Sequence, residues 1–157
     1  MTEQLARIAY LSDNLIRGGD EQVSAQIARI LSSSRRRNPE LNVTGALVFN
    51  RGIFAQVLEG PTDGVTHLFE KIKSDPRHCK VDVLESNPTT ERAFPNWSMA
   101  YFGLSNVYGT KFEGLAGETE FDDRLLLSDR VLSTRGISLL RSLTMHWKMN
   151  VRSSLAK

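Results

Sequence analysis

One amide stands where a strand would normally carry an apolar side chain. In the stretch Asn42–Pro61, NVTGALVFNRGIFAQVLEGP, Gln56 lies between Phe54 and Leu58 at the two-residue spacing of one strand face. The residues that alternate with them are also apolar, so we expect a central strand covered on both sides. A buried amide without partners costs about 1–3 kcal/mol. Gln56 therefore needs a hydrogen-bond partner, and taken alone the simplest one is a neighbouring backbone group.

A phenol occupies a similar position near the start of the chain. Tyr10 lies in the run Leu5–Ser12, where Ile8 shares its face and the alternate residues are apolar, which predicts a strand. A buried phenol hydroxyl also requires a partner. The amide of Gln56 can donate from its nitrogen or accept at its oxygen, and rotating it exchanges these roles. Tyr10 and Gln56 are thus the pair best suited to hydrogen-bond chemistry.

The elements that must position this pair follow a βαββαββ order. Glu21–Ser34 shows helical spacing of apolar residues with Asp20 as its N-cap, and a second helix opens at Pro61-Thr62-Asp63 and ends at Asp75-Pro76. The expected strands are Leu5–Ser12, Val43–Phe49, Ile53–Leu58, Val81–Leu84 and Trp97–Phe102. This order predicts an α+β, ferredoxin-like sandwich: a five-stranded mixed sheet with two helices on one face.

The remaining sheet face needs a cover, because large exposed apolar surfaces are uncommon in monomeric proteins. Apolar residues recur at helical spacing in the last part of the chain, from Leu125 to Trp147. We therefore predict a domain over residues 1–104, a glycine-rich linker over 105–117, and a C-terminal helical extension over 118–157 that packs on the sheet.

Composition narrows the class of protein. The chain has 157 residues, of which 40% are hydrophobic and 24% charged, and a net charge of +2, which is too small to indicate nucleic-acid or membrane partners. A single cysteine, Cys79, fits a reducing cytoplasm, and three scattered histidines lack the spacing of a metal site. Arg35-Arg36-Arg37 is read as a solvated helix end, and without an aromatic platform it is weak evidence for nucleic-acid binding.

Five short motifs, in order and at matching spacing, carry a family resemblance. They are RIAYLS from Arg7, NPELNVTGALVF from Asn38, GIFAQVLEGP from Gly52, DPRH from Asp75 and FPNWSM from Phe94. Together they closely resemble the BLUF family of blue-light sensors that bind a flavin, over about Leu5 to Leu104. The chain has no glycine-rich phosphate loop, nucleophile elbow or metal set, so we do not expect an enzyme.

The resemblance implies a non-covalently bound flavin, with FAD favoured and FMN or riboflavin as alternatives. It places the ring between the two helices, in an apolar slot to which Ile27, Ile30, Leu68 and Ile72 could contribute, although the same residues suit an ordinary core. The cofactor-binding residues that we expect are Tyr10, Ile27, Asn38, Phe54, Gln56, Leu58, Lys71, Ile72, Asp75 and His78.

The resemblance also implies a photochemical role for Tyr10 and Gln56. The excited flavin takes an electron and then a proton from Tyr10, Gln56 rearranges, and return of the electron leaves a changed hydrogen-bond network. Trp97 and Met99, two residues apart in the last expected strand, would relay the change. Their alternative is plain core packing.

Three positions depart from the usual BLUF pattern. Asn42 stands where relatives often have Gly, and the turn can survive because Asn tolerates a left-handed backbone conformation. Lys71 stands where the family commonly has Arg, which keeps the charge but loses the bidentate geometry. Arg37 stands where the family often has a second Asn. None of these departures affects Tyr10 or Gln56.

Because the C-terminal segment is too short for an independent catalytic domain, we expect output through a separate signalling protein. The resemblance suggests a cyclic-dinucleotide enzyme or a response-regulator-like protein, and self-association into a homo-oligomer. The alternative is a light-insensitive interaction module that retains the fold.

Overall fold

The computed structural model describes residues 3–50, 53–95, 98–105, 109–113 and 118–121. Its elements are, in order, β1 (Leu5–Asn14), α1 (Asp20–Arg37), the 3-10 helix η1 (Asn38–Leu41), β2 (Thr44–Asn50), β3 (Ile53–Pro61), α2 (Thr62–Lys73), β4 (His78–Thr89), β5 (Ala100–Ser105), β6 (Gly109–Glu113) and β7 (Glu118–Phe121). No helix in these ranges is long and apolar enough to span a membrane.

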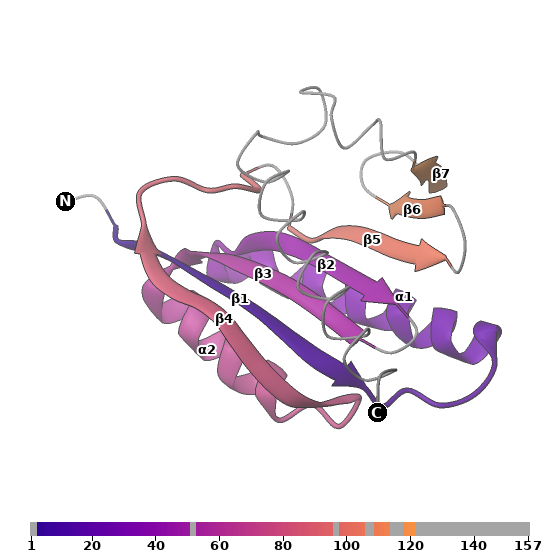
Figure 1. Ribbon diagram of the computed structural model, residues 1–157. Helices are drawn as coiled ribbons and strands as arrows, with labels where there is room; N and C mark the ends of the chain where they lie inside the picture. Colours follow the sequence, from indigo (N-terminus) through magenta and orange to yellow (C-terminus); the bar gives the residue numbers. More distant parts are fainter. Residues whose placement is uncertain (1–2, 51–52, 96–97, 106–108, 114–117, 122–157) are drawn as a thin grey trace.

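The strands form one mixed sheet in the order β4-β1-β3-β2-β5-β6-β7. All neighbouring strands are antiparallel except β2 and β5, which run parallel. Figure 1 shows α1 and α2 on the same face of this sheet. The α+β class, the mixed sheet and the two helices on one face therefore agree with the prediction from the sequence.

The sheet has seven strands in the described part of the chain, not the expected five. β6 falls within residues 105–117, which we expected to form a linker, and β7 begins the expected helical extension. Glycines suggested a linker, but β6 supplies backbone partners to the otherwise open edge of β5. Residues 122–157 lie outside the described residues, so the C-terminal helices remain a prediction.

Two strand boundaries also differ from the expected ones. β4 runs from His78 to Thr89 and is far longer than Val81–Leu84, because an edge strand can continue through polar residues that its open side leaves in water. β5 begins at Ala100 rather than Trp97, so Met99 immediately precedes the strand.

The helices pack on the sheet through apolar residues at helical spacing. In α1, Ile27 and Leu31 are buried four residues apart, and in α2 the buried residues are Val65, Leu68 and Phe69. The N-cap of α1 is Gly19, so Asp20 is its first helical residue instead of the expected cap. An acidic residue is favourable there as well, because the first turn carries the positive end of the helix dipole.

The register of β1 against β3 sets the position of the two polar groups identified above. Tyr10 is directly opposite Gln56, and on its other side Gln56 is opposite Leu47 of β2. Both side chains face α1 and α2, because Ile8 and Leu58, which share their strand faces, belong to the helix-side core. Backbone pairing alone thus brings a phenol and an amide together beneath the helices.

A buried ion pair anchors the far end of β3. Glu59, with 0% of its surface exposed, accepts hydrogen bonds from Nε and Nη2 of Arg7 at 3.0 and 2.9 Å. The same carboxylate accepts from the backbone N–H groups of Ala93 and Phe94 at 2.8–2.9 Å. Glu59 thereby ties the connection between β4 and β5 to the central strands.

We expect Glu59→Ala to lower the free energy of unfolding by about 3–5 kcal/mol, because it removes the closest, fully buried anion from Arg7 and the carboxylate that accepts from two backbone N–H groups. Glu85→Ala is the matched control. Glu85 also pairs with Arg7, at 3.5 Å, but its side chain is partly exposed, so we expect a loss below about 1 kcal/mol. Urea denaturation followed by circular dichroism measures both values, and equal losses would contradict the prediction.

Candidate functional site

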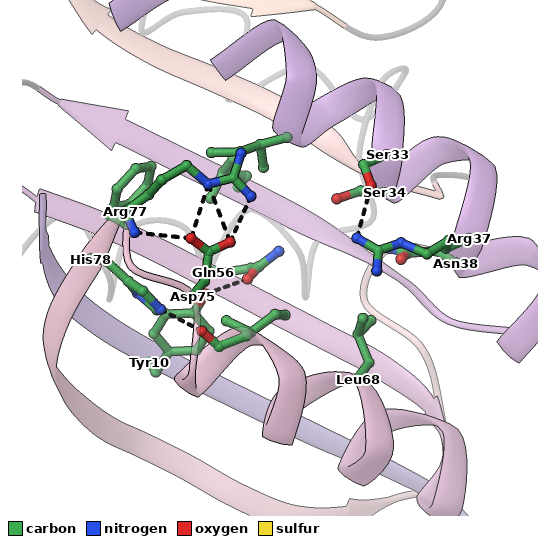
Figure 2. A pocket seen from close by; sticks show the side chains of 14 residues that line it. Tyr10, Ser33, Ser34, Arg37, Asn38, Gln56, Leu68, Asp75, Arg77 and His78 are labelled. Carbon is green, nitrogen blue, oxygen red and sulfur yellow. Dashed lines mark hydrogen bonds and ion pairs between the residues drawn. The ribbon is translucent and has the colours of Figure 1, made fainter. Parts of the chain in front are cut away.

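A pocket opens on the helix side of the sheet, between α1 and the C-terminal end of α2 (Figure 2). Residues from β1, α1, η1, β2, β3, α2 and the start of β4 contribute to it. Its lining consists of Tyr10, Ile30, Ser33, Ser34, Arg37, Asn38, Leu47, Phe54, Gln56, Leu68, Ile72, Asp75, Arg77 and His78. The pocket thus combines apolar and aromatic side chains with polar and charged ones, as a site for a small molecule with a polar edge requires.

The hydroxyl of Tyr10 donates a hydrogen bond to Oε1 of Gln56 inside this pocket. The two residues are only 2% and 4% exposed. The partner of the buried amide is therefore a side chain, not the backbone group that the sequence alone made simplest. Burial raises the pKa of the Tyr10 phenol far above its ordinary value of 10.0, and the negative charge of Asp75 raises it further. Tyr10 is consequently a protonated donor at physiological pH.

The other end of the Gln56 amide has a weaker partner. Its Nε2 lies 3.7 Å from Sδ of Met99, which is also buried. A thioether sulfur is a weak acceptor. Gln56 therefore has one strong hydrogen bond within the pocket and one weak contact to the residue that leads into β5.

Asn38 presents a second buried amide, 1% exposed, at the end of α1. Its Nδ2 donates to the carbonyl oxygen of Ser98 at 2.7 Å. Its backbone is fixed on both sides, because its N–H bonds to Ser34 and its carbonyl accepts from Val43. Among the described residues, no donor reaches Oδ1 of Asn38. A buried acceptor in a pocket wall calls for a ligand N–H group.

Asp75 and Arg77 form an ion pair at one side of the pocket. Nε and Nη2 of Arg77 approach the carboxylate at 2.9 and 2.6 Å, and the Arg77 backbone N–H also donates to it. The hydrogen bond from the Arg77 side chain lowers the pKa of Asp75, although partial burial opposes this. The carboxylate is therefore charged, and its charge is largely balanced by Arg77.

Both ring nitrogens of His78 are engaged by the protein. Nε2 lies 2.5 Å from the carbonyl oxygen of Ile72, so it must carry the proton, since a carbonyl only accepts. Nδ1 lies 2.7 Å from Oγ of Ser12, which donates to it when the ring is neutral. His78 thus joins β1, α2 and β4 and lines the pocket without a free ring nitrogen.

The structure brings together most of the residues expected from the sequence. Those that line the pocket are Tyr10, Asn38, Phe54, Gln56, Ile72, Asp75 and His78. Ile27 and Leu58 are instead buried in the helix–sheet core, because their side chains pack between the layers. Lys71 is exposed and does not line the pocket, and the cationic partner of Asp75 is Arg77. Trp97 lies outside the described residues.

Several lining residues were missed at the level of sequence: Ser33, Ser34, Arg37, Leu47 and Arg77. A signal for those on α1 was present, because Ile30, Ser33, Ser34 and Arg37 are three or four residues apart and share a helix face. Leu47 is opposite Gln56 across the β2–β3 pair, and this register follows from the hairpin. Arg77 lies within the quoted DPRH motif but had been assigned no role.

Comparison with known proteins places this geometry in a family. A chain titled "BlrB - a BLUF protein, dark state structure" superposes with a TM-score of 0.59 at 36% identity, over 66% of this chain and 75% of that one. The photoactivated adenylate cyclase subunit beta of Euglena longa is 40% identical over 74 residues, 46% of this chain but 9% of that protein. The blue light- and temperature-regulated antirepressor BluF of Escherichia coli K12 is 35% identical over 85 residues, 54% of this chain and 21% of that protein.

The chain thus spans only a small part of these two curated relatives. The family model described as "Sensors of blue-light using FAD" matches residues 5–100, well over half of the sequence. The protein belongs to the BLUF family of flavin-dependent blue-light sensors.

Proposed function

We propose that this chain is a blue-light photoreceptor that holds a flavin non-covalently in the pocket and signals to a separate protein by rearranging the hydrogen bonds of Tyr10 and Gln56. One observation carries the proposal. The two side chains that would do the chemistry are hydrogen-bonded to each other and line the same pocket.

The residues of the pocket fit a flavin. Leu47, Phe54, Leu68 and Ile72 offer apolar surface to a planar ring. The unpaired Oδ1 of Asn38 is an acceptor suited to the imide N–H at the polar edge of the ring, and it is buried where that edge would be shielded from water. FAD is the flavin that the BLUF family uses.

When bound, a flavin would supply the absorption of blue light and an acceptor for one electron and one proton. The chain's own part begins with Tyr10, which the surrounding desolvation keeps protonated, so the phenol has a proton to give and to recover. While that proton is away, the Tyr10 oxygen accepts rather than donates. Gln56 can then rotate its amide so that Nε2 donates a hydrogen bond to the Tyr10 oxygen. The electron and proton then return to Tyr10, and nothing is consumed.

Rotation of Gln56 would change its contact with Met99. In the structure the amide nitrogen faces Sδ of Met99, but after rotation the amide oxygen would face the sulfur, and both atoms are acceptors. Met99 would then have to repack, which its flexible side chain permits. Met99 immediately precedes β5, which pairs with β2, so that movement would reach the sheet at this pair of strands. We include Trp97 in the same relay.

We propose that output goes to another protein rather than to a catalytic site in this chain. The curated relatives named above are a photoactivated adenylate cyclase and a light-regulated antirepressor, so BLUF domains occur with different effectors. For this chain we propose a separate signalling protein, such as a cyclic-dinucleotide enzyme or a response-regulator-like protein, and a homo-oligomeric receptor.

Purified protein should be yellow, and blue light should shift its flavin absorption reversibly to longer wavelengths. Gln56→Leu and Tyr10→Phe should each abolish the shift while flavin stays bound, because each removes one side of the hydrogen-bond exchange. Tyr101→Phe is the matched control, since Tyr101 packs at the edge of the core but does not line the pocket, and it should keep the shift. Absorption spectra before and after illumination measure these outcomes, and a normal shift in both site variants would defeat the mechanism.

The burial of Tyr10 also predicts a pH dependence of stability. The pKa of the phenol is higher in the folded than in the unfolded chain, so its contribution is fully present below about pH 10 and is lost as the pH rises above it. Cofactor-free wild type should therefore lose up to about 1.4 kcal/mol more per pH unit above 10 than Tyr10→Phe does. Urea denaturation at pH 8 and 10.5 tests this; parallel losses would show that Tyr10 ionises freely in the folded state.

A further inference from the structure

The pocket carries an arginine that the proposed photochemistry does not use. Arg37, in the last turn of α1, lines the pocket and is exposed to solvent. Its Nη2 donates to Oγ of Ser33 at 2.8 Å, and the hydroxyl of Ser34 lines the same wall. Among the described residues, no carboxylate pairs with Arg37. This rim of the pocket therefore has an uncompensated positive charge next to two hydroxyl groups.

The opposite rim is different. There the guanidinium of Arg77 is held by the carboxylate of Asp75 at 2.6 Å, so its charge is balanced within the protein. An anion approaching that side would meet the negative charge of Asp75. Figure 2 shows Arg37, Ser33 and Ser34 on one side of the pocket and the Asp75–Arg77 pair on the other. The α1 side is the one that would attract an anion.

The natural flavins share the ring but differ in charge: riboflavin is neutral, FMN has one phosphate, and FAD has two. The buried amides of Asn38 and Gln56 suit the polar edge of the ring. A phosphate, in contrast, must stay near water or near a cation, because burying an unpaired charge is costly. The exposed end of the pocket is therefore where a phosphate belongs, and Arg37 is the cation available there.

We propose that Arg37, with the hydroxyls of Ser33 and Ser34, binds the phosphate of a phosphorylated flavin and makes the pocket select FMN or FAD over riboflavin. This inference rests on the proposed function, since it assumes that the pocket binds a flavin. A guanidinium makes strong, charge-assisted hydrogen bonds to phosphate. The negative end of the α1 dipole opposes an anion at this position, but the guanidinium of Arg37 itself lies in the last turn of the helix and offsets it.

The test is a fluorescence titration of the flavin-free 157-residue chain with riboflavin, FMN and FAD. Wild type should bind FMN about tenfold or more tightly than riboflavin, as expected for the loss of charged hydrogen bonds. Arg37→Ala should remove most of that ratio by weakening FMN, while riboflavin affinity shows that the variant is folded. Arg37→Lys should retain part of the preference, because the charge remains without the fork.

Arg36→Ala is the matched control. Arg36 has the same charge and adjoins Arg37 but is exposed outside the pocket, so its removal should leave the FMN to riboflavin ratio unchanged. Equal affinities of wild type for riboflavin and FMN would overturn the inference. The inference would also fail if Arg37→Ala weakened FMN and riboflavin equally, because Arg37 would then contact the ring. It would fail as well if Arg36→Ala lowered the FMN to riboflavin ratio as much as Arg37→Ala, because the preference would then come from the overall positive charge of this surface.

The outcomes also separate this inference from the proposed function. Protein that binds riboflavin and shows the light-induced shift, but does not prefer FMN or FAD, retains the photoreceptor function and loses the phosphate site. Protein that binds none of the three flavins loses both.

Discussion

The site depends on the register between β1 and β3, which places Tyr10 directly opposite Gln56. A slip of one residue would turn every side chain of one strand to the other face, so the phenol and the amide would no longer meet. The register is held by the apolar residues that share this face and by the ion pair of Arg7 and Glu59 farther along the same strands. The polar pair in the pocket is thus positioned by backbone pairing and core packing, and its own hydrogen bond need not define the fold.

β3 combines firm and weak attachments within a few residues. Glu59 is fully buried and accepts hydrogen bonds from Arg7 and from the backbone N–H groups of Ala93 and Phe94. Gln56, three residues earlier, has a single strong partner and a thioether that holds it only weakly. The same strand is therefore firmly held where it anchors the β4–β5 connection and weakly held where, in the proposed mechanism, the amide exchanges partners. In the proposed mechanism, a change in the hydrogen bonds of Gln56 would therefore move Met99 and the start of β5, and the rest of β3 would stay in place.

Much of this arrangement could be predicted from the residues, and the failures have physical causes. Strand alternation and helical spacing gave the layers, and Gln56 was found because a polar amide breaks an apolar pattern. Edge strands lack such a pattern, so β4 appeared too short, and β6 was hidden in a glycine-rich stretch. Ile27 and Lys71 could not be assigned from sequence alone, because whether a helical side chain faces a pocket, the core or water depends on the rotation of the helix. Leu58 shares a strand face with Gln56, but where the pocket ends along β3 depends on how the helices pack over it. Arg77 was missed since its pairing with Asp75 requires a turn that spacing does not reveal.

The amide of Asn38 has two duties. Its nitrogen holds the carbonyl of Ser98, while its oxygen is available to whatever occupies the pocket. Ser98 adjoins Met99, whose sulfur contacts the amide nitrogen of Gln56. If the proposed function holds, flavin binding at Asn38 and the light-driven change at Gln56 would both act on the dipeptide Ser98-Met99, so the flavin-free protein would differ from the dark, flavin-bound protein at that dipeptide. The presence or absence of flavin in the pocket would then influence the same residues, Ser98 and Met99, as illumination does.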